Sequence, residues 1–315
     1  MILFSARISQ KHKNALQEKY PDKQFVFCNN MDAAKAYIHQ TEVLVTYGED
    51  LHAELITNAA KLKWIMVLSA GMETMPFKEI AERGIYVTNA RGIHKTPMAE
   101  YAISMLLQVL RETKTLLNNQ QEQIWDRSIR MQELKGKTML VLGTGAIGQE
   151  TARLAQAFGV TTVGVSKSGK PVTHFDENHQ TKDLESLVPH ADLVVSVLPS
   201  TKETEGLFKY GYFEQMPNHA IFLNMGRGDL VKSGDLLKAI QEGEIAHAIL
   251  DVFEEEPLSE DHPFWKEVNI TITPHLSGMS KHYVRRALAI FEKNLQVYHS
   301  GKDDFINKIN TSRGY

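Results

Sequence analysis

The segment from Thr138 to Gly148, Thr-Met-Leu-Val-Leu-Gly-Thr-Gly-Ala-Ile-Gly, constrains the fold of this chain more than any other. Its apolar run, from Met139 to Leu142, predicts a buried strand of a parallel sheet. Glycines in G-x-G-x-x-G spacing follow, and a helical pattern begins directly after them. Strand, glycines and helix in this order predict a dinucleotide-binding Rossmann fold, whereas the glycine spacing alone would be a weak signal.

Each glycine of this loop has a predicted role in holding a dinucleotide. Gly143 would permit the tight turn, Gly145 would let the backbone approach a pyrophosphate, and Gly148 would let helix and strand pack closely. The N–H groups near Ala146 and Ile147 would face the phosphates at the positive end of the helix dipole. The alternative is an ordinary glycine-rich turn between a strand and a helix.

Composition narrows the class of protein. A length of 315 residues predicts about two domains, and the formal charge of −3 argues against a nucleic acid or an acidic membrane surface as partner. The single cysteine, Cys28, allows no internal disulfide and favours a reducing compartment such as the cytoplasm. No apolar stretch is long enough for a signal peptide or a membrane span. Without an H-E-x-x-H motif or a cysteine pair, no metal site is expected.

Strand-like and helix-like patterns alternate along the chain, which predicts α/β organisation with parallel sheets. Helical patterns separate the early strands, at 11–18, 33–38 and 52–59, and a long helical segment runs from Pro97 to about Asn118. The last helix is expected at 281–298. The first series of predicted strands is 2–4, 25–27, 43–45, 64–67 and 85–87; the second is 140–142, 162–165, 193–197, 221–224, 248–250 and 270–272.

The end of the second strand after the glycine loop predicts which cofactor is preferred. An NAD-binding fold is expected to carry an acidic residue there, which accepts from the ribose hydroxyls. This chain has Ser166, Lys167 and Ser168 instead, which offer hydroxyl donors and one cation to a 2′-phosphate. We therefore expect NADP(H) to be preferred. In the alternative, Lys167 is merely solvated and NAD(H) is used.

Three polar segments each follow a predicted strand of the second series. They are 224–231 with Arg227 between two glycines, 250–257 with three consecutive glutamates, and 273–278 with His275. Since ligands bind open α/β sheets at the carboxyl ends of the strands, these residues are expected to meet at one edge.

Four motifs in this order give the chain a specific resemblance. They are the glycine loop, Leu198-Pro-Ser-Thr-Lys-Glu-Thr204, the Gly-Arg-Gly segment, and the pair of Glu-Pro and Pro-His. Together they resemble the D-2-hydroxyacid dehydrogenases, a family of D-isomer-specific NAD(P)-dependent reductases that includes glyoxylate/hydroxypyruvate reductases. The resemblance implies two lobes: a Rossmann nucleotide-binding domain, 95–276, inserted in a flavodoxin-like α/β substrate-binding domain, 1–94 plus 277–315. It also implies a homodimer through the nucleotide-binding lobes and the helix after Pro97.

The resemblance assigns the catalytic roles. It implies Arg227 as the substrate-binding arginine, Glu256 as the carboxylate before proline, and His275 as the acid/base. Reduction of a 2-keto acid needs a hydride at C2 and a proton on the carbonyl oxygen, which an imidazolium beside a carboxylate supplies. An arginine fork can hold the substrate carboxylate. By spacing alone, Glu254 or Glu255 could equally well be this carboxylate. Only its position directly before Pro257 favours Glu256.

Further positions carry roles implied by the resemblance. Asp251 would accept from the nicotinamide carboxamide, and Pro199 would lie beside the adenosine. In the first lobe, Ala70 and Gly71 would offer backbone N–H groups to the substrate carboxylate.

The sequence thus predicts an enzyme that reduces a small 2-keto acid, similar to glyoxylate or hydroxypyruvate, to the D-2-hydroxy acid with NADPH. Two other interpretations stay open. One is a nucleotide-sensing interaction module of the same fold without significant turnover. The other is an NAD-linked relative of the phosphoglycerate dehydrogenase type.

Overall fold

The structure is a computed structural model that describes residues 1–69, 72 and 75–311. It divides into two compact units: unit 1 contains 1–93 and 280–315, and unit 2 contains 94–279. The sequence predicts a first lobe of 1–94 plus 277–315, whereas residues 94 and 277–279 belong to unit 2. Each unit is built on one parallel sheet, as the alternating pattern predicts.

Unit 1 contains a five-stranded sheet in the order β2-β1-β3-β4-β5. This is the flavodoxin-like order, and it confirms the predicted fold class of the first lobe. All neighbouring strands are parallel. Ile2, the first residue of β1, is paired with Phe25, the first residue of β2, and with Val43, the first residue of β3. The strands are β1 (Ile2–Phe4), β2 (Phe25–Phe27), β3 (Val43–Thr46), β4 (Trp64–Val67) and β5 (Tyr86–Asn89).

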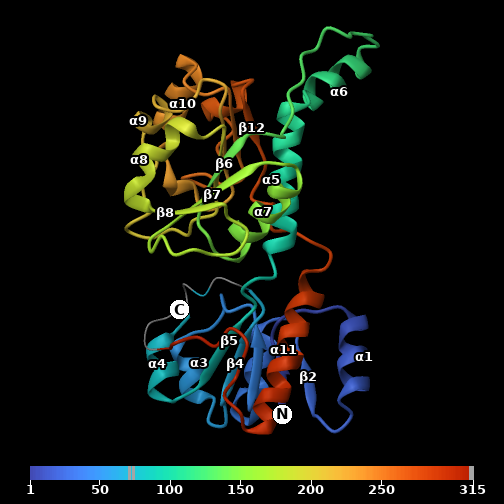
Figure 1. The fold of residues 1–315 in the computed structure, drawn as a ribbon. Coiled ribbons are helices and arrows are strands. Elements are labelled where there is room, and N and C mark those ends of the chain that lie inside the picture. The colour runs from blue at the N-terminus through green and yellow to red at the C-terminus, as the bar shows by residue number, and fades with distance from the viewer. Residues whose placement is uncertain (70–71, 73–74, 312–315) are drawn as a thin grey trace. The chain divides into compact units, whose positions relative to one another are not determined.

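Helices cover both faces of this sheet (Figure 1). On one face, α1 (Gln10–Lys19) and α11 (Tyr283–Ser300) pack on a core that includes Phe4 and Trp64. The other face is covered by α2 (Met31–Ala34), a 3-10 helix (Lys35–Gln40), α3 (Ala53–Asn58) and α4 (Phe77–Glu82). Because both faces are buried, the strands are almost entirely apolar, which is why their positions can be read from the sequence.

Unit 2 contains a seven-stranded parallel sheet in the order β12-β11-β10-β9-β6-β7-β8. The order reverses between β6 and β9, which is the Rossmann arrangement, and the glycine loop follows β6 at this point. The predicted Rossmann domain is therefore confirmed. Its strands are β6 (Thr138–Leu142), β7 (Thr161–Ser166), β8 (Glu177–Gln180), β9 (Leu193–Ser196), β10 (Ile221–Asn224), β11 (His247–Leu250) and β12 (Ile270–Ile272).

Alternate residues of these strands pack against helices on opposite faces. Met139 and Val141 lie in the core with α5 (Lys95–Leu110) and α7 (Ala146–Ala157). Leu140 and Leu142 lie in the core with α8 (Leu184–Leu187), α9 (Tyr210–Phe213) and α10 (Ser233–Glu242), as Figure 1 shows. Short 3-10 helices lie at Thr181–Asp183, Val188–His190, Gly228–Leu230 and Pro263–Lys266.

Two elements differ from the prediction. The helical segment predicted from Pro97 to Asn118 is two helices, because Glu112 adopts a left-handed φ of 54° before α6 (Thr113–Gln121). None of the α6 residues, all of which the structure describes, is buried. The strand β8 was not predicted, since its Glu-Asn-His-Gln sequence is polar. It pairs with β7 at the edge of the sheet, where no apolar face is required.

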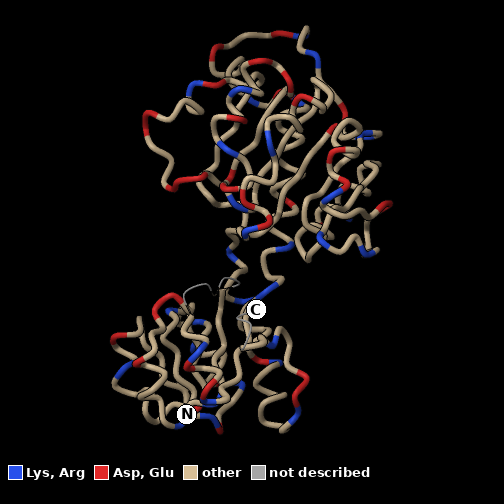
Figure 2. The backbone as a smooth tube through the Cα atoms, turned by 90° about the vertical axis from the view of Figure 1, so that its left-hand side faces the viewer, with Lys and Arg blue, Asp and Glu red and all other residues tan. Residues whose placement is uncertain are grey.

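Charges of both signs are interspersed along the loops and helices of each unit (Figure 2). Across the described part of the chain, no helix has the length and apolar character needed to cross a bilayer. In the same ranges, no three His, Cys, Asp or Glu side chains are grouped so that they could hold a metal ion.

Candidate active site at the carboxyl edge of the unit 2 sheet

The glycine loop has the geometry of a phosphate-binding turn. Gly143 has a φ of +106°, which side chains rarely tolerate. A Cβ on Gly148 would lie 1.9 Å from the Gly143 carbonyl oxygen, so only glycine fits there. A Cβ on Gly145 would meet no described atom within 4 Å, and α7 begins at the next residue. The open side of the turn thus presents the first N–H groups of α7, including those near Ala146 and Ile147, and fits a pyrophosphate.

The loop after β7 holds the predicted ribose contacts. The Ser166 and Ser168 hydroxyl oxygens accept from the N–H groups of Gly169 and Lys170, at 3.2 and 3.3 Å. Lys167 is exposed, and its Nζ lies 3.1 Å from Oε1 of Glu203, which follows β9. The hydrogen bond from Lys167 lowers the pKa of the Glu203 carboxyl. Sequence reasoning missed Glu203 because it is 36 residues away from Lys167 in the chain.

The segment after β9 is tied to its neighbours by hydroxyl groups. The Thr204 hydroxyl donates to the Pro199 carbonyl at 2.6 Å, and the Ser200 hydroxyl donates to the Asp229 carboxylate. Pro199 itself is exposed at the carboxyl end of β9, next to the strand that carries the glycine loop.

Arg227 is presented on a tightly fixed turn after β10. The buried Asn224 side chain donates to the Arg227 carbonyl at 2.9 Å and accepts from the Gly226 N–H at 3.1 Å. A Cβ on Gly226 would lie 2.5 Å from Leu198 O, and one on Gly228 would lie 1.9 Å from the Phe253 carbonyl carbon. The Arg227 side chain is exposed. Within the described residues its only bond runs from Nη1 to Gly226 O at 2.8 Å, which leaves further donors for an anion.

His275 and Glu256 form a hydrogen-bonded pair at the ends of β12 and β11. His275 Nδ1 lies 2.7 Å from Glu256 Oε2, and the Phe253 N–H donates to Glu256 Oε1 at 3.0 Å. Glu254 instead accepts from the Ser233 N–H and pairs with Lys232. The structure therefore brings Glu256, and not Glu254, to the imidazole. The His275 side chain is 51% exposed.

Asp251 is completely buried at the end of β11. Its Oδ1 accepts from the Thr273 hydroxyl at 2.6 Å and from the Leu276 N–H at 2.9 Å, and its Oδ2 accepts from the Ser277 N–H at 2.9 Å. The carboxylate thus holds the loop that carries His275. Its predicted contact with a nicotinamide carboxamide stays a prediction.

All these residues follow neighbouring strands of one parallel sheet, so they lie along one edge of unit 2. Ala70 and Gly71, predicted to bind the substrate carboxylate, lie outside the described residues.

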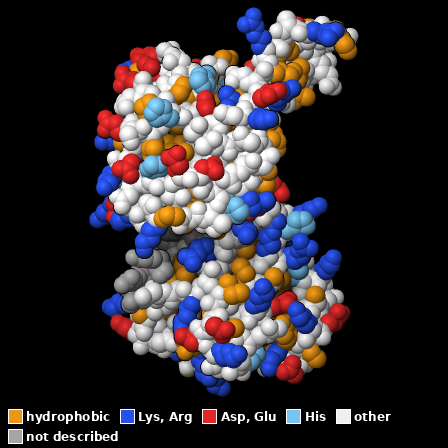
Figure 3. All heavy atoms as spheres, viewed as in Figure 1, with side chains coloured by type: hydrophobic (Ala, Val, Ile, Leu, Met, Phe, Trp, Pro, Cys, Tyr) orange, Lys and Arg blue, Asp and Glu red, His pale blue; other side chains and the backbone are white. Residues whose placement is uncertain are grey.

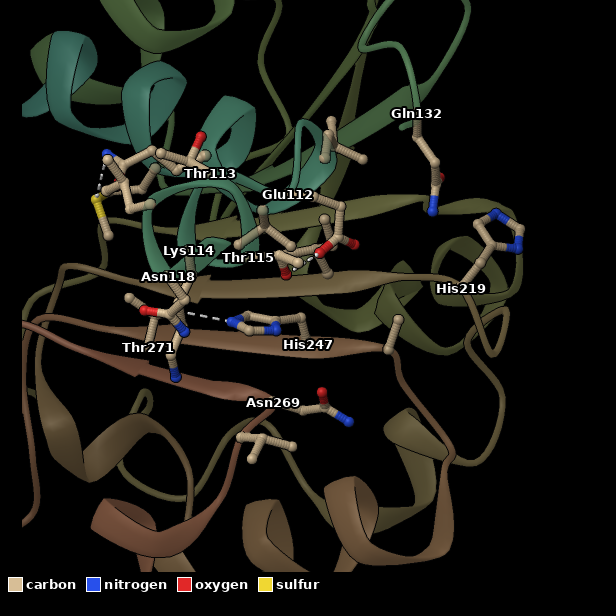
Figure 4. A pocket seen from close by; sticks show the side chains of 18 residues that line it. Glu112, Thr113, Lys114, Thr115, Asn118, Gln132, His219, His247, Asn269 and Thr271 are labelled. Atoms are coloured by element: carbon tan, nitrogen blue, oxygen red, sulfur yellow. Dashed lines mark hydrogen bonds between the residues drawn. The ribbon is translucent and has the colours of Figure 1, made fainter. Parts of the chain in front are cut away.

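A cavity of about 600 Å³ lies at the other edge of the same sheet (Figure 4). His219, His247 and Asn269, near the amino ends of β10, β11 and β12, line it together with the start of α6. His247 Nε2 lies 2.8 Å from the Thr271 hydroxyl. Burial, with a contribution from the charge of Lys114, lowers the pKa of His247 to about 4. The cavity is therefore separate from the residues predicted to perform the chemistry.

Residues 103–277 match the family described as D-isomer specific 2-hydroxyacid dehydrogenase, NAD binding domain. A glyoxylate reductase of Thermococcus litoralis is 33% identical over 283 residues, which cover 86% of this chain and 85% of that protein. A D-isomer specific 2-hydroxyacid dehydrogenase family protein from Aeromonas salmonicida superposes with a TM-score of 0.86 at 33% identity, over 98% of both chains. A D-isomer specific 2-hydroxyacid dehydrogenase from Xanthobacter autotrophicus, in complex with NADPH and MES, has a TM-score of 0.80 at 25% identity, over 100% of this chain and 99% of that one.

Proposed function

Since the chain belongs to the D-isomer specific 2-hydroxyacid dehydrogenase family, we propose that it reduces a small 2-keto acid to the D-2-hydroxy acid. The family uses a nicotinamide cofactor and a small 2-hydroxy or 2-keto acid. The observation that carries the proposal is the His275–Glu256 pair, which lies at the same sheet edge as the glycine loop and Arg227. Glyoxylate and hydroxypyruvate are the proposed substrates, and the similarity to a glyoxylate reductase supports them.

His275 performs the proton transfer in this proposal. Its Nδ1 faces Glu256, so Nε2 is the nitrogen that donates a proton to the carbonyl oxygen of the keto acid. The Glu256 carboxylate bonds to Nδ1 and thereby fixes the orientation of the ring. When the reaction runs towards oxidation of the hydroxy acid, the neutral imidazole accepts the proton of the substrate hydroxyl.

Arg227 binds and orients the substrate. Its planar guanidinium can donate two parallel bonds to the substrate carboxylate or one to the carbonyl oxygen. The turn of Arg227 is packed on both sides by backbone, which fixes its Cα, and the bond from Nη1 to Gly226 O orients the guanidinium. Fixed donors lower the barrier because they need no reorganisation as charge develops on the oxygen. Ala70 and Gly71 of unit 1 would add backbone donors to the same carboxylate.

Residues along the same edge would hold the cofactor. A bound nicotinamide supplies the hydride that C2 of the keto acid accepts. Gly143, Gly145 and Gly148 with the start of α7 would hold the pyrophosphate, and Pro199 would lie beside the adenosine. The Asp251 carboxylate already accepts three hydrogen bonds from the loop of His275. It would therefore contact the carboxamide through a remaining lone pair of its oxygens.

NADP(H) is the proposed preferred cofactor, with NAD(H) as the second. Ser166, Lys167 and Ser168 support this choice, because an exposed cation and two hydroxyls suit a 2′-phosphate. The relative that is in complex with NADPH is consistent with it. Glu203 opposes it, since its carboxylate already pairs with Lys167. The pair is exposed on both sides and therefore weak, so a 2′-phosphate with nearly two negative charges can replace Glu203.

A homodimer through unit 2 is the proposed assembly, in a reducing compartment such as the cytoplasm. Residues 113–131 form an arm that begins with α6 and carries apolar side chains into solvent (Figures 1 and 3). Its Trp125 is 91% exposed. Exposed apolar patches of this kind mark interaction surfaces, and the cavity at the root of the arm offers a second copy a place for them. The exposed apolar residues of the arm are Leu116, Leu117, Ile124, Trp125 and Met131.

A panel of 2-keto acids assayed with NADPH and with NADH tests the proposed function. We expect rapid oxidation of the reduced cofactor with glyoxylate or hydroxypyruvate, and chiral analysis should give the D-hydroxy acid wherever C2 is a stereocentre. Cofactor binding without turnover on any member of the panel would overturn the proposal and favour a nucleotide-sensing protein.

A further inference from the structure

A chain of hydroxyl groups runs through unit 2 from helix α5 to the loop of His275. The Tyr101 hydroxyl, on α5, lies 2.7 Å from the Thr273 hydroxyl, which follows β12. The Thr273 hydroxyl lies 2.6 Å from Oδ1 of Asp251, which follows β11. This chain of hydrogen bonds therefore joins α5 to the ends of β12 and β11, which lie much later in the sequence.

Chemistry fixes the direction of each bond in this chain. The Asp251 carboxylate only accepts, so Thr273 uses its single proton on Asp251. The Thr273 oxygen must then accept from Tyr101. Burial raises the pKa of the Tyr101 phenol to about 12, which keeps it protonated and able to donate. Hydrogen bonds in such a chain strengthen one another in a buried setting.

Asp251 connects the chain to the backbone around His275. The Asp251 carbonyl accepts from the His275 N–H at 2.9 Å, and its carboxylate accepts from the N–H groups of Leu276 and Ser277. His275 itself has a φ of +50°, the left-handed region that non-glycine residues rarely adopt. Such a conformation persists only where surrounding bonds over-determine it.

We infer that Tyr101 and Thr273 are positioning residues for His275, because they orient the Asp251 carboxylate that fixes the loop from His275 to Ser277. Neither residue touches Glu256 or the exposed face of the imidazole through the bonds that the structure describes. They act on the imidazole through Asp251 and the backbone. The inference rests on the proposed role of His275 as acid/base.

Two substitutions remove the hydroxyls at nearly constant shape: Thr273→Val and Tyr101→Phe. A displacement of about 1 Å in a catalytic group costs on the order of 10²-fold in rate, so we expect kcat to fall by about 10-fold or more for Thr273→Val. Tyr101→Phe leaves the bond from Thr273 to Asp251 in place, and its effect should be smaller. The KM for the keto acid should change little, because Arg227 is untouched. Thr273→Ser keeps the hydroxyl and should restore most of kcat.

The matched control is Tyr210→Phe. It removes a phenol hydroxyl that bonds to the Glu242 and Glu244 carboxylates of the same unit, near α10 and away from His275. We expect it to leave kcat unchanged.

Amide hydrogen exchange at Leu276 and Ser277 supplies a readout that needs no turnover. It should accelerate in Thr273→Val and Tyr101→Phe and stay unchanged in Tyr210→Phe. If Thr273→Val and Tyr101→Phe both fold and amide exchange at Leu276 and Ser277 is unchanged in both, the hydrogen bonds from Tyr101 through Thr273 to Asp251 do not hold this loop. Faster exchange with kcat within about twofold of the wild type would overturn the positioning role. Should Thr273→Val not fold, Tyr101→Phe alone decides between these results. If the wild-type chain itself reduces no 2-keto acid, it is the proposed function that fails.

Discussion

His275 Nδ1 and Glu256 Oε2 lie 2.7 Å apart, although the two residues follow different strands of the unit 2 sheet. Of the three consecutive glutamates, the one before Pro257 reaches the imidazole, while Glu254 is bound to Ser233 and Lys232. The pair leaves Nε2 of His275 for a ligand. The proposed chemistry therefore depends on a single ring nitrogen and on the carboxylate behind it.

Replacing His275 by alanine should remove the proton donor. We expect kcat to fall by about 10² to 10⁴-fold, the contribution typical of general acid–base catalysis. Cofactor affinity, measured by quenching of protein fluorescence, should stay close to that of the wild type, since the glycine loop is unaltered. His190→Ala, at an exposed 3-10 turn, serves as control. Turnover that survives in His275→Ala would show that the acid lies elsewhere.

Glu256→Gln should keep a hydrogen bond to Nδ1 but lose the negative charge. A carboxylate makes a stronger hydrogen bond to Nδ1 than an amide oxygen does, so the imidazole should be held less firmly in the variant. We therefore expect kcat to fall by about 10-fold, as initial rates at saturating cofactor and keto acid would show. Glu254→Gln is the matched control, and its kcat should match the wild type. An unchanged kcat in Glu256→Gln would show that the carboxylate does not act on His275.

Arg227→Lys should test the substrate fork. Lysine keeps the charge but loses the planar pair of donors, so we expect the KM for the keto acid to rise by about 10-fold. Initial rates over a range of keto acid at saturating cofactor measure this. Arg153→Lys, whose arginine pairs with Glu150 on α7, should have no effect. A KM unaffected by Arg227→Lys would assign carboxylate binding to other groups.

Two opposite substitutions should shift the cofactor preference in opposite directions. Lys167→Asp places a carboxylate beside the 2′-phosphate and should favour NADH. Glu203→Gln releases Lys167 from its ion pair and should raise the preference for NADPH by a few-fold, since exposed pairs are weak. The ratio of kcat/KM for the two cofactors measures both effects, with Glu205→Gln as control. A wild-type preference for NADH, unaltered by Lys167→Asp, would refute the assignment.

His247 should make the stability of the fold depend on pH. Its pKa is lowered from the ordinary 6.5 to about 4. Between these two pH values His247 binds a proton in the unfolded chain but stays neutral in the folded chain. The contribution of His247 to the free energy of unfolding should therefore be constant above pH 6.5 and should fall between pH 6.5 and 4, by up to roughly 3 kcal/mol. Urea unfolding at several pH values measures this. His247→Gln should flatten the dependence in that window, whereas His190→Gln should not.

The fold could be predicted where side chains are buried on both faces of a sheet. Trp64–Val67 is apolar throughout and Ile221–Asn224 is apolar up to its last residue, and both strands begin and end where the sequence indicates. Polar β8 carries no such signal. The break at Glu112 carries none either, because a left-handed glutamate has neither the glycine nor the proline that usually marks a turn.

The candidate site could be predicted at the ends of strands and not within its supporting contacts. Arg227 and His275 stand beside glycine or proline in recognisable motifs. Tyr101 lies within α5 and Thr273 lies just after β12; they are 172 residues apart, and no motif in the sequence joins them. Their meeting depends on how α5 packs against the sheet, a tertiary contact that no local pattern encodes. The ion pair of Lys167 and Glu203 is likewise a tertiary contact, between loops that follow β7 and β9, and no local pattern encodes it.

The left-handed backbone conformation of His275 lowers the stability of the fold, whereas its imidazole serves the proposed activity. Glycine is the residue that this conformation suits, and a β-carbon there costs about 1 kcal/mol. A selection for heat resistance alone would therefore favour glycine at position 275 and would discard the imidazole with it. Because His275 is the proposed acid/base, engineering for thermostability should hold this residue constant while it varies the rest.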